Sequence, residues 1–235
     1  LTGVQVAVVV PTTLLARQHF STFRDRFEGF PINVRQLSRF VSPKDADTVR
    51  EGLKTGSVDL VIGTHALLSK SVDFANLGLL IVDEEQHFGV GHKERLKQIK
   101  ADVHVLTLTA TPIPRTLQMA LTGVRDLSLM ATPPVDRLAV RTFLMPYDHV
   151  VIREALMRER FRGGQSFYVC PRLADLDAMA LQLKRIAPDI KVVMGHGQMS
   201  PTALENVMTA FSDGEFDVLL ATNIIESGLD LPRVN

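Results

Sequence analysis

The sequence contains a single cysteine, Cys170, and no tryptophan among its 235 residues. One cysteine excludes an internal disulfide and a zinc cluster built from cysteines, and it favours a reducing compartment. A buried structural thiol is the simplest interpretation of Cys170. Positive and negative side chains are balanced, at 26 Lys plus Arg against 26 Asp plus Glu. The chain therefore has no net positive electrostatic field to attract nucleic acid, and any contact with nucleic acid must come from a local group of residues.

Long apolar runs are also absent. The longest covers residues 6–10, which is far too short to span a bilayer, and no basic and apolar leader opens the chain. We therefore expect a cytoplasmic protein with no membrane partner. The chain starts without methionine and stops directly after an apolar and acidic motif. We expect it to be a piece of a longer protein.

Strands and helices alternate along the sequence, as in α/β proteins. Apolar runs predict strands at residues 4–10, 33–37, 58–63, 78–82, 103–108, 138–144, 165–169, 191–194 and 217–221. Helical spacing and capping residues predict helices at 14–27, 42–56, 66–68, 92–100, 148–161, 173–186 and 200–211. Strands joined through helices imply right-handed crossovers and parallel sheets.

A proline pair, Pro133 and Pro134, interrupts this alternation. Adjacent prolines cannot continue a helix or a central strand. We therefore predict two domains, at residues 1–131 and 138–235, joined by a short Pro-containing linker at 132–137. The two halves repeat one architecture, but the sequence shows no residue-level repeat between them.

The stretch from Leu79 to Gln86 reads Leu-Leu-Ile-Val-Asp-Glu-Glu-Gln and organises the first half. Four apolar residues suit a central strand buried on both faces. Asp83 and Glu84 then lie beyond the carboxyl end of the strand, where open parallel sheets bind ligands. An acid there can hold Mg²⁺ on nucleotide phosphates, and a second acid can activate water. The alternative is a strand followed by a solvated acidic turn.

Hydroxyl, histidine and glycine residues follow five other predicted strands. Such loops suit phosphate oxygens, although Pro-Thr-Thr is equally a plain helix cap. A small residue at Gly63 would let backbone approach a ligand. The loop residues are Thr12 and Thr13; Thr64; Thr109 and Thr111; His196 and Gly197; and Thr222.

These loops and the acids occur in the order and spacing of motifs Ia, Ib, II, III and V of superfamily 2 helicases, which the whole chain resembles. Within that superfamily, residues 38–40, 88–90, 92–95, 111–117 and 137–140 resemble the bacterial transcription-repair coupling factors (Mfd). RecG, the fork-reversal helicase, is the near relative and shares the run at 111–117. The resemblance implies two RecA-like domains, both incomplete in this chain.

The resemblance also implies residue roles in ATP hydrolysis. Asp83 would help to hold Mg²⁺, Glu84 would activate the attacking water, and Gln86 would couple the nucleotide to the loop at residues 109–111. Gly228 and Asp230 would reach ATP from the second domain. Such a motor opens and closes its crevice as ATP binds and leaves.

The same resemblance implies contacts along double-stranded DNA. Backbone contacts position a strand without reading its sequence. In a coupling factor the movement displaces stalled RNA polymerase and recruits a nucleotide excision repair protein. The candidate DNA contacts are Thr12, Thr13, Arg39, Thr64, Thr109, Thr111, Arg115, His196, Gly197 and Thr222.

Two helicase motifs are missing from the sequence. It contains neither Gly-x-x-x-x-Gly-Lys-Ser/Thr, which cradles the phosphates, nor the Gln-x-x-Gly-Arg-x-Gly-Arg of motif VI. We therefore expect this chain alone to be inactive.

Two rival classes remain open at this stage. A non-catalytic DNA-binding module would need no carboxylate pair and would be expected to have a basic face. An α/β hydrolase or phosphatase that uses Asp83 as a nucleophile would leave the threonine-rich loops unexplained. Nucleotide-dependent DNA affinity separates the three classes.

Overall fold

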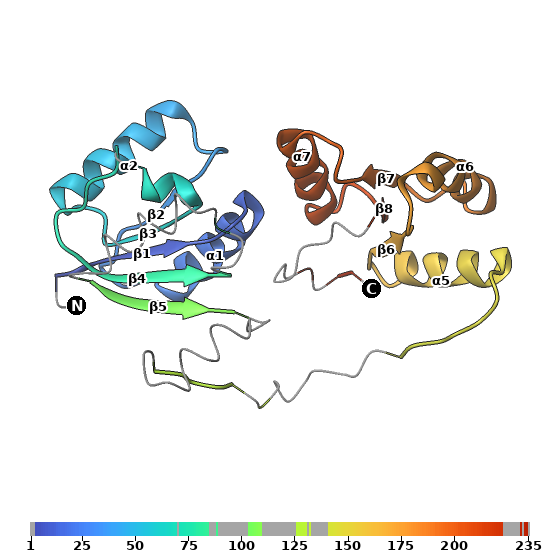
Figure 1. Ribbon diagram of the computed structural model, residues 1–235, viewed down its shortest axis with the longest axis horizontal. Helices are drawn as coiled ribbons and strands as arrows, with labels where there is room; N and C mark the ends of the chain where they lie inside the picture. The colour runs from blue at the N-terminus through green and yellow to red at the C-terminus, as the bar shows by residue number, and fades with distance from the viewer. Residues whose placement is uncertain are drawn as a thin grey trace.

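The computed structural model describes residues 3–69, 71–84, 88, 103–109, 126–130, 132, 141–222, 231, 233 and 234. Within these residues the chain forms two units, each built on a parallel β-sheet (Figure 1). The first unit contains β1 to β5, and the second contains β6 to β8. The two parallel sheets predicted from the alternation of strands and helices are thus present.

The first sheet has the strand order β2-β3-β1-β4-β5, and each neighbouring pair is parallel. Apolar, largely β-branched runs form the central strands because both of their faces are covered. The bounds are β1 (Gln5–Val9), β2 (Val34–Leu37), β3 (Leu60–Gly63), β4 (Leu77–Asp83) and β5 (His104–Leu108).

Helices cover both faces of the first sheet. Val8 packs with Leu15 of α1 (Thr13–Arg26), whereas Val9 packs with Leu53 of α2 (Pro43–Thr55). Successive side chains of a strand point to opposite faces, so the two helices lie on opposite sides of β1. A short 3₁₀ helix, η1 (His65–Leu68), follows β3 on the α2 side.

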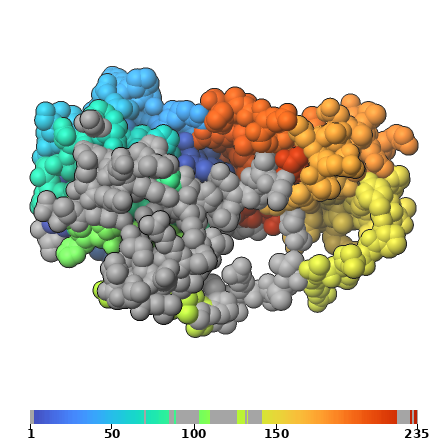
Figure 2. All heavy atoms as spheres, in the orientation of Figure 1, coloured from blue at the N-terminus to red at the C-terminus, as the bar shows by residue number. Residues whose placement is uncertain are grey.

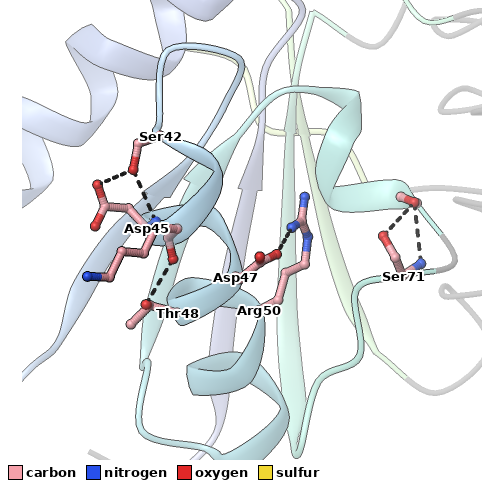
Figure 3. A network of polar contacts seen from close by, with 8 residues as sticks. Ser42, Asp45, Asp47, Thr48, Arg50 and Ser71 are labelled. Atoms are coloured by element: carbon pink, nitrogen blue, oxygen red, sulfur yellow. Dashed lines mark hydrogen bonds and ion pairs between the residues drawn. The ribbon is translucent and has the colours of Figure 1, made fainter.

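The ends of α2 match the sequence signals for a helix start and stop. Ser42 Oγ accepts a hydrogen bond from the Asp45 main-chain N–H at 3.2 Å and donates one to the Asp45 carboxylate at 2.7 Å (Figure 3). Pro43 occupies the first turn, and Gly56 ends the helix at φ 80°. A side-chain cap, an early proline and a left-handed glycine each favour these bounds.

The second unit repeats this arrangement on a smaller scale. Its sheet has the order β6-β8-β7, with β6 (Ser166–Val169), β7 (Val192–Gly195) and β8 (Val218–Ala221) all parallel. On one face lie α5 (His149–Phe161) and α6 (Leu176–Ile186), with η3 (Leu173–Asp175) before α6. Helix α7 (Pro201–Ser212) covers the other face.

A residue-level repeat that is not evident in the sequence is present in the structure. Gln5 Nε2 donates to two main-chain carbonyls, at the end of α2 and before β3, at 3.0 and 2.8 Å. Gln165 Nε2 does the same at the end of α7 and before β8, at 2.6 and 2.7 Å. Asp59 and Asp217 likewise accept the N–H of the residue before β2 and β7. The two units therefore share these side-chain to main-chain hydrogen bonds as well as their strand topology.

One predicted strand is wrong over the part that the structure describes. Residues 141–144 were expected to continue a strand from residue 138, but they have no regular secondary structure and are exposed. A strand requires a neighbour for its N–H and C=O groups, and none pairs with these residues in the described part of the second sheet. Their apolar side chains, Phe143 and Leu144, gave a strand signal that this sheet does not use.

Other predictions fall on residues outside the described ranges. These are the helix at 92–100 and most of the linker at 132–137, so the domain boundary stays a prediction. None of the described helices is both long enough and apolar enough to cross a membrane.

Helix α7 lies on the side of the second unit that faces the first (Figure 1). It packs against α1, and the spheres of the two units touch there (Figure 2). Arg17 on α1 donates two hydrogen bonds to the carboxylate of Asp213, which caps the end of α7, at 3.0 and 2.8 Å.

Candidate functional site

The carboxylate pair lies at the carboxyl end of β4, where the sequence predicts it. Asp83 is the last residue of the strand, and Glu84 follows with φ 51°. Glu84 is the one described non-glycine residue with a positive φ. Such a conformation costs free energy and is concentrated at functional sites. The chain thus turns sharply between the two carboxylates.

Glu84 is held by the neighbouring strand end. Its side chain is buried, and Thr109 Oγ1 donates to Glu84 Oε2 at 3.3 Å. Its main-chain N–H donates to the carbonyl of Leu108 at 2.9 Å. Thr109, which was expected among the DNA contacts, is therefore placed beside the carboxylates. A buried acid anchored in this way has a fixed orientation, which a general base requires.

Asp83 is more accessible than Glu84. Its Oδ2 lies 3.2 Å from His19 Nε2 on α1, and its side chain is 18% exposed. No group of three or more metal-ligating side chains occurs within the described ranges. Mg²⁺ in nucleotide sites is held by one or two carboxylates, phosphates and water, so one accessible acid at a strand end fits it.

Four of the first-unit residues predicted to contact DNA lie around one cavity of about 720 Å³. It is located at the carboxyl ends of β1, β2 and β3, as expected for the crevice of an open parallel sheet. Thr12, Thr13, Arg39 and Thr64 all line it. The structure thus brings together residues as far apart in the sequence as Thr12 and Thr64.

The threonines of this cavity have structural roles as well. Thr12 is the N-cap of α1, and its hydroxyl accepts the N–H of Leu15 at 3.3 Å. Thr13 and Thr64 are both buried in the present arrangement. The helix-cap interpretation of Pro-Thr-Thr is therefore confirmed, and a phosphate would have to enter the cavity to reach the two buried hydroxyls.

Gly63 allows β3 to lie close to β2, rather than allowing a ligand to approach the backbone. A Cβ at this position would lie 2.2 Å from the carbonyl oxygen of Leu37 on β2 and 2.9 Å from Leu67. Glycine is the residue that fits such a close backbone approach. The small residue before Thr64 is thus explained by packing between β2, β3 and η1.

Helix α7 of the second unit closes the cavity, contributing Pro201, Leu204, Glu205 and Met208. Arg39 forms an ion pair with Glu205, and its Nη1 donates to the hydroxyl of Thr202 at 2.9 Å. Arg39, proposed from sequence as a DNA contact, is therefore engaged with the other unit.

The second-unit candidates form a separate group. His196 and Gly197 follow β7, and Thr222 follows the adjacent strand β8. The Thr222 N–H points to the carbonyl of Gly195 at 3.4 Å, and His196 Nδ1 is buried without a hydrogen-bond partner. None of the three lines the first-unit cavity. They lie after the carboxyl ends of two adjacent parallel strands, as their positions in the sequence predict.

Five candidate residues lie outside the described part of the chain: Gln86, Thr111, Arg115, Gly228 and Asp230. Their roles stay predictions. Sequence reasoning also missed His19, Glu205 and Asp213, which contact Asp83, Arg39 and Arg17. Each lies within or at the end of a helix with no motif signal of its own, and only tertiary packing identifies its partner.

Cys170 lies directly after β6 and is buried, as the sequence suggested. Burial raises the pKa of its thiol, and the nearby Asp175 carboxylate raises it further. A thiol with a raised pKa is a poor nucleophile at neutral pH. This residue therefore has a packing role.

Comparison with known proteins gives matches over both units. The DEAD/DEAH box helicase model matches residues 1–120, and the helicase conserved C-terminal domain model matches residues 149–235. Transcription-repair-coupling factors are 55% identical over 231 residues in Rickettsia conorii, 54% over 233 in Bacillus subtilis and 52% over 231 in Escherichia coli. These alignments cover 98%, 99% and 98% of the chain, which spans about a fifth of each relative.

Solved structures agree with these matches. RecG bound to a three-way DNA junction has a TM-score of 0.79 and 36% identity, over 99% of this chain and 31% of that one. The helicase MrfA bound to DNA and AMPPNP has a TM-score of 0.63 at 17% identity, over 97% and 36%, and shares the fold.

These similarities confirm the expected resemblance to superfamily 2 helicases, to coupling factors and to RecG, and with it the two RecA-like sheets. The hydrolase alternative, in which Asp83 acts as a nucleophile, loses its basis. Because the first family model covers half of the sequence, the chain belongs to the DEAD/DEAH box helicase family.

Proposed function

We propose that the chain is the central part of an ATP-dependent translocase on double-stranded DNA. The observation that carries this proposal is the anchored carboxylate pair, Asp83 and Glu84, on the same sheet edge as the cavity lined by Thr12 and Thr64. One edge thus offers groups for nucleotide hydrolysis and groups for a phosphate backbone. Coupling the two is what a motor requires.

In this proposal the two carboxylates have different roles in ATP hydrolysis. Asp83, accessible and oriented by His19, would hold Mg²⁺, and the ion would supply positive charge to the phosphates of ATP. Glu84, buried and held by Thr109, would orient the attacking water and accept its proton. Thr109 joins the end of β5 to Glu84, so a shift of this loop would move the base.

DNA contacts in the proposal are made through phosphates. Hydroxyls and Arg39 around the cavity, with His196, Gly197 and Thr222 of the second unit, would position the backbone without reading bases. Affinity should then fall steeply with salt and vary little with base sequence. Binding of labelled duplexes of different sequence across a salt series tests this, and strong preference for one sequence at fixed salt contradicts it.

The biological role we propose is that of a bacterial coupling factor, acting in the cytoplasm. It would displace stalled RNA polymerase and recruit a nucleotide excision repair protein. The support is the identity of 50 to 55% with proteins of that name. Because the chain spans about a fifth of their length, both partner surfaces would lie outside it.

A second candidate is a fork-reversal core, favoured by the likeness to RecG on a three-way junction. Two assays in a protein that contains this chain together with both missing motifs separate the candidates. A coupling factor should release stalled RNA polymerase in the presence of ATP and leave branched DNA intact. A fork-reversal enzyme should convert three-way junctions and leave the polymerase in place. If neither reaction occurs and Glu84→Gln changes nothing, the chain is a non-catalytic DNA-binding module.

A further inference from the structure

The contact between the two units engages an arginine that the proposed function assigns to DNA. Arg39 follows β2 and lines the cavity together with Thr12 and Thr64. Its guanidinium is paired with the carboxylate of Glu205 and bonded to Thr202, both on α7. A phosphate needs the same guanidinium donors that these oxygens occupy. Arg39 therefore has two alternative anionic partners.

A second ion pair reinforces the first. Arg17 and Asp213 are joined by two hydrogen bonds, at 3.0 and 2.8 Å, between α1 and the end of α7. The two pairs bind opposite parts of one helix to the first unit. Glu205 is on α7 and Asp213 is its C-cap, whereas both arginines belong to the first unit.

The closed contact is incompletely satisfied. Glu205 Oε1 is buried without a hydrogen-bond partner. Buried polar atoms without partners cost free energy, so part of the gain from the ion pairs is offset. The arginine side chains are half exposed, at 49% for Arg17 and 42% for Arg39, and exposed ion pairs contribute little. Such a contact is one that a competing anion could open.

We propose that Glu205 competes with DNA phosphate for Arg39, so that the acids of α7 limit DNA affinity by holding the units closed over the cavity. This inference rests on the proposed function, because it takes the DNA backbone as the competing anion. In this closed arrangement Thr13 and Thr64, which line the cavity, are buried. Opening it frees the guanidinium and gives a phosphate access to both hydroxyls.

The central test is a double-mutant cycle on DNA affinity in the 235-residue chain. Glu205→Gln should raise affinity for a labelled duplex about two- to five-fold, the range expected when an exposed ion pair is lost. Arg39→Gln should lower affinity and reduce the slope of log affinity against log salt by about one. In the Arg39→Gln background, Glu205→Gln should have no further effect.

The matched control is Glu154→Gln, which removes the same charge from an exposed position on α5. It should change affinity by less than about twofold, since long-range effects of one exposed charge are screened. If Glu205→Gln raises affinity equally with and without Arg39, or no more than the control does, general charge removal explains the result and the competition is refuted.

Closure itself is measured without DNA. Spin labels are attached through Lys54→Cys on α2 and Lys184→Cys on α6, both exposed, in a Cys170→Ser background. The distance distribution should be narrow, and Glu205→Gln combined with Asp213→Asn should broaden it. An unchanged distribution overturns the inference. If it broadens but the parent chain binds no DNA, the ion-pair closure stands and the proposed DNA function fails.

Discussion

Glu84→Gln and Asp83→Asn should separate nucleotide hydrolysis from nucleotide binding. The test uses a protein that contains this chain together with the phosphate-binding and arginine motifs. Glutamine retains the shape of Glu84 and an oxygen that can accept the 3.3 Å bond from Thr109. The bond is long, so its loss should change the free energy of unfolding by about 1 kcal/mol. The protein should therefore stay folded.

The loss in chemistry should be much larger than the loss in stability. A general base is typically worth about 10²- to 10⁴-fold in rate, so turnover of Glu84→Gln should fall by that factor. Affinity for ATP and Mg²⁺ should stay within several-fold, because Asp83 and its contact with His19 are unchanged. The variant should accumulate in its ATP-bound state.

Asp83→Asn should instead weaken Mg²⁺-dependent nucleotide binding as well as turnover. It removes the charge nearest the proposed metal and changes the carboxylate oxygen that contacts His19. Equilibrium binding of a fluorescent nucleotide with and without Mg²⁺, together with single-turnover hydrolysis, measures both quantities. If Glu84→Gln loses nucleotide binding but keeps its chemical rate, the roles of the two carboxylates are reversed and the reasoning is refuted.

Three further predictions use the 235-residue chain. It should not hydrolyse ATP, because the phosphate-binding and arginine motifs that stabilise the transferring phosphate are missing from the sequence. If the chain does hydrolyse ATP, and Glu84→Gln abolishes that activity, the prediction is wrong. Gln165→Met should lower the free energy of unfolding of the second unit by about 2 to 4 kcal/mol, because two main-chain carbonyls lose their hydrogen-bond donor. Denaturant unfolding measures this against the exposed control Gln198→Met, and equal unfolding midpoints for the two variants would show that the Gln165 hydrogen bonds do not stabilise the unit. At any pH near neutrality, Cys170 should react with a thiol reagent far more slowly in the folded protein than in the unfolded chain, since burial raises the pKa of the thiol and shields it. Fast reaction in the folded protein would show that β6 opens readily.

Local sequence patterns determined much of this protein. Apolar runs at positions such as 79–82 predict central strands because a strand covered on both faces must be apolar throughout. Ser42, Pro43 and Gly56 set the limits of α2 because caps act through residues a few positions away. The strand-end position of Asp83 and Glu84 placed them at the carboxyl edge of the sheet, where open parallel sheets bind ligands. Residues 141–144 show the limit of this logic, since a strand also needs a neighbour that local sequence does not name.

Contacts between distant residues were decided by the tertiary structure alone. The pairing of Arg39 with Glu205 joins two units, and nothing local in a helix specifies which of its exposed acids will meet an arginine of another unit. The same holds for His19 beside Asp83 and for the shared supports Gln5 and Gln165. Side-chain hydrogen bonds and ion pairs act over a few ångströms in space, whatever the separation along the chain, so only the packed fold brings their partners together.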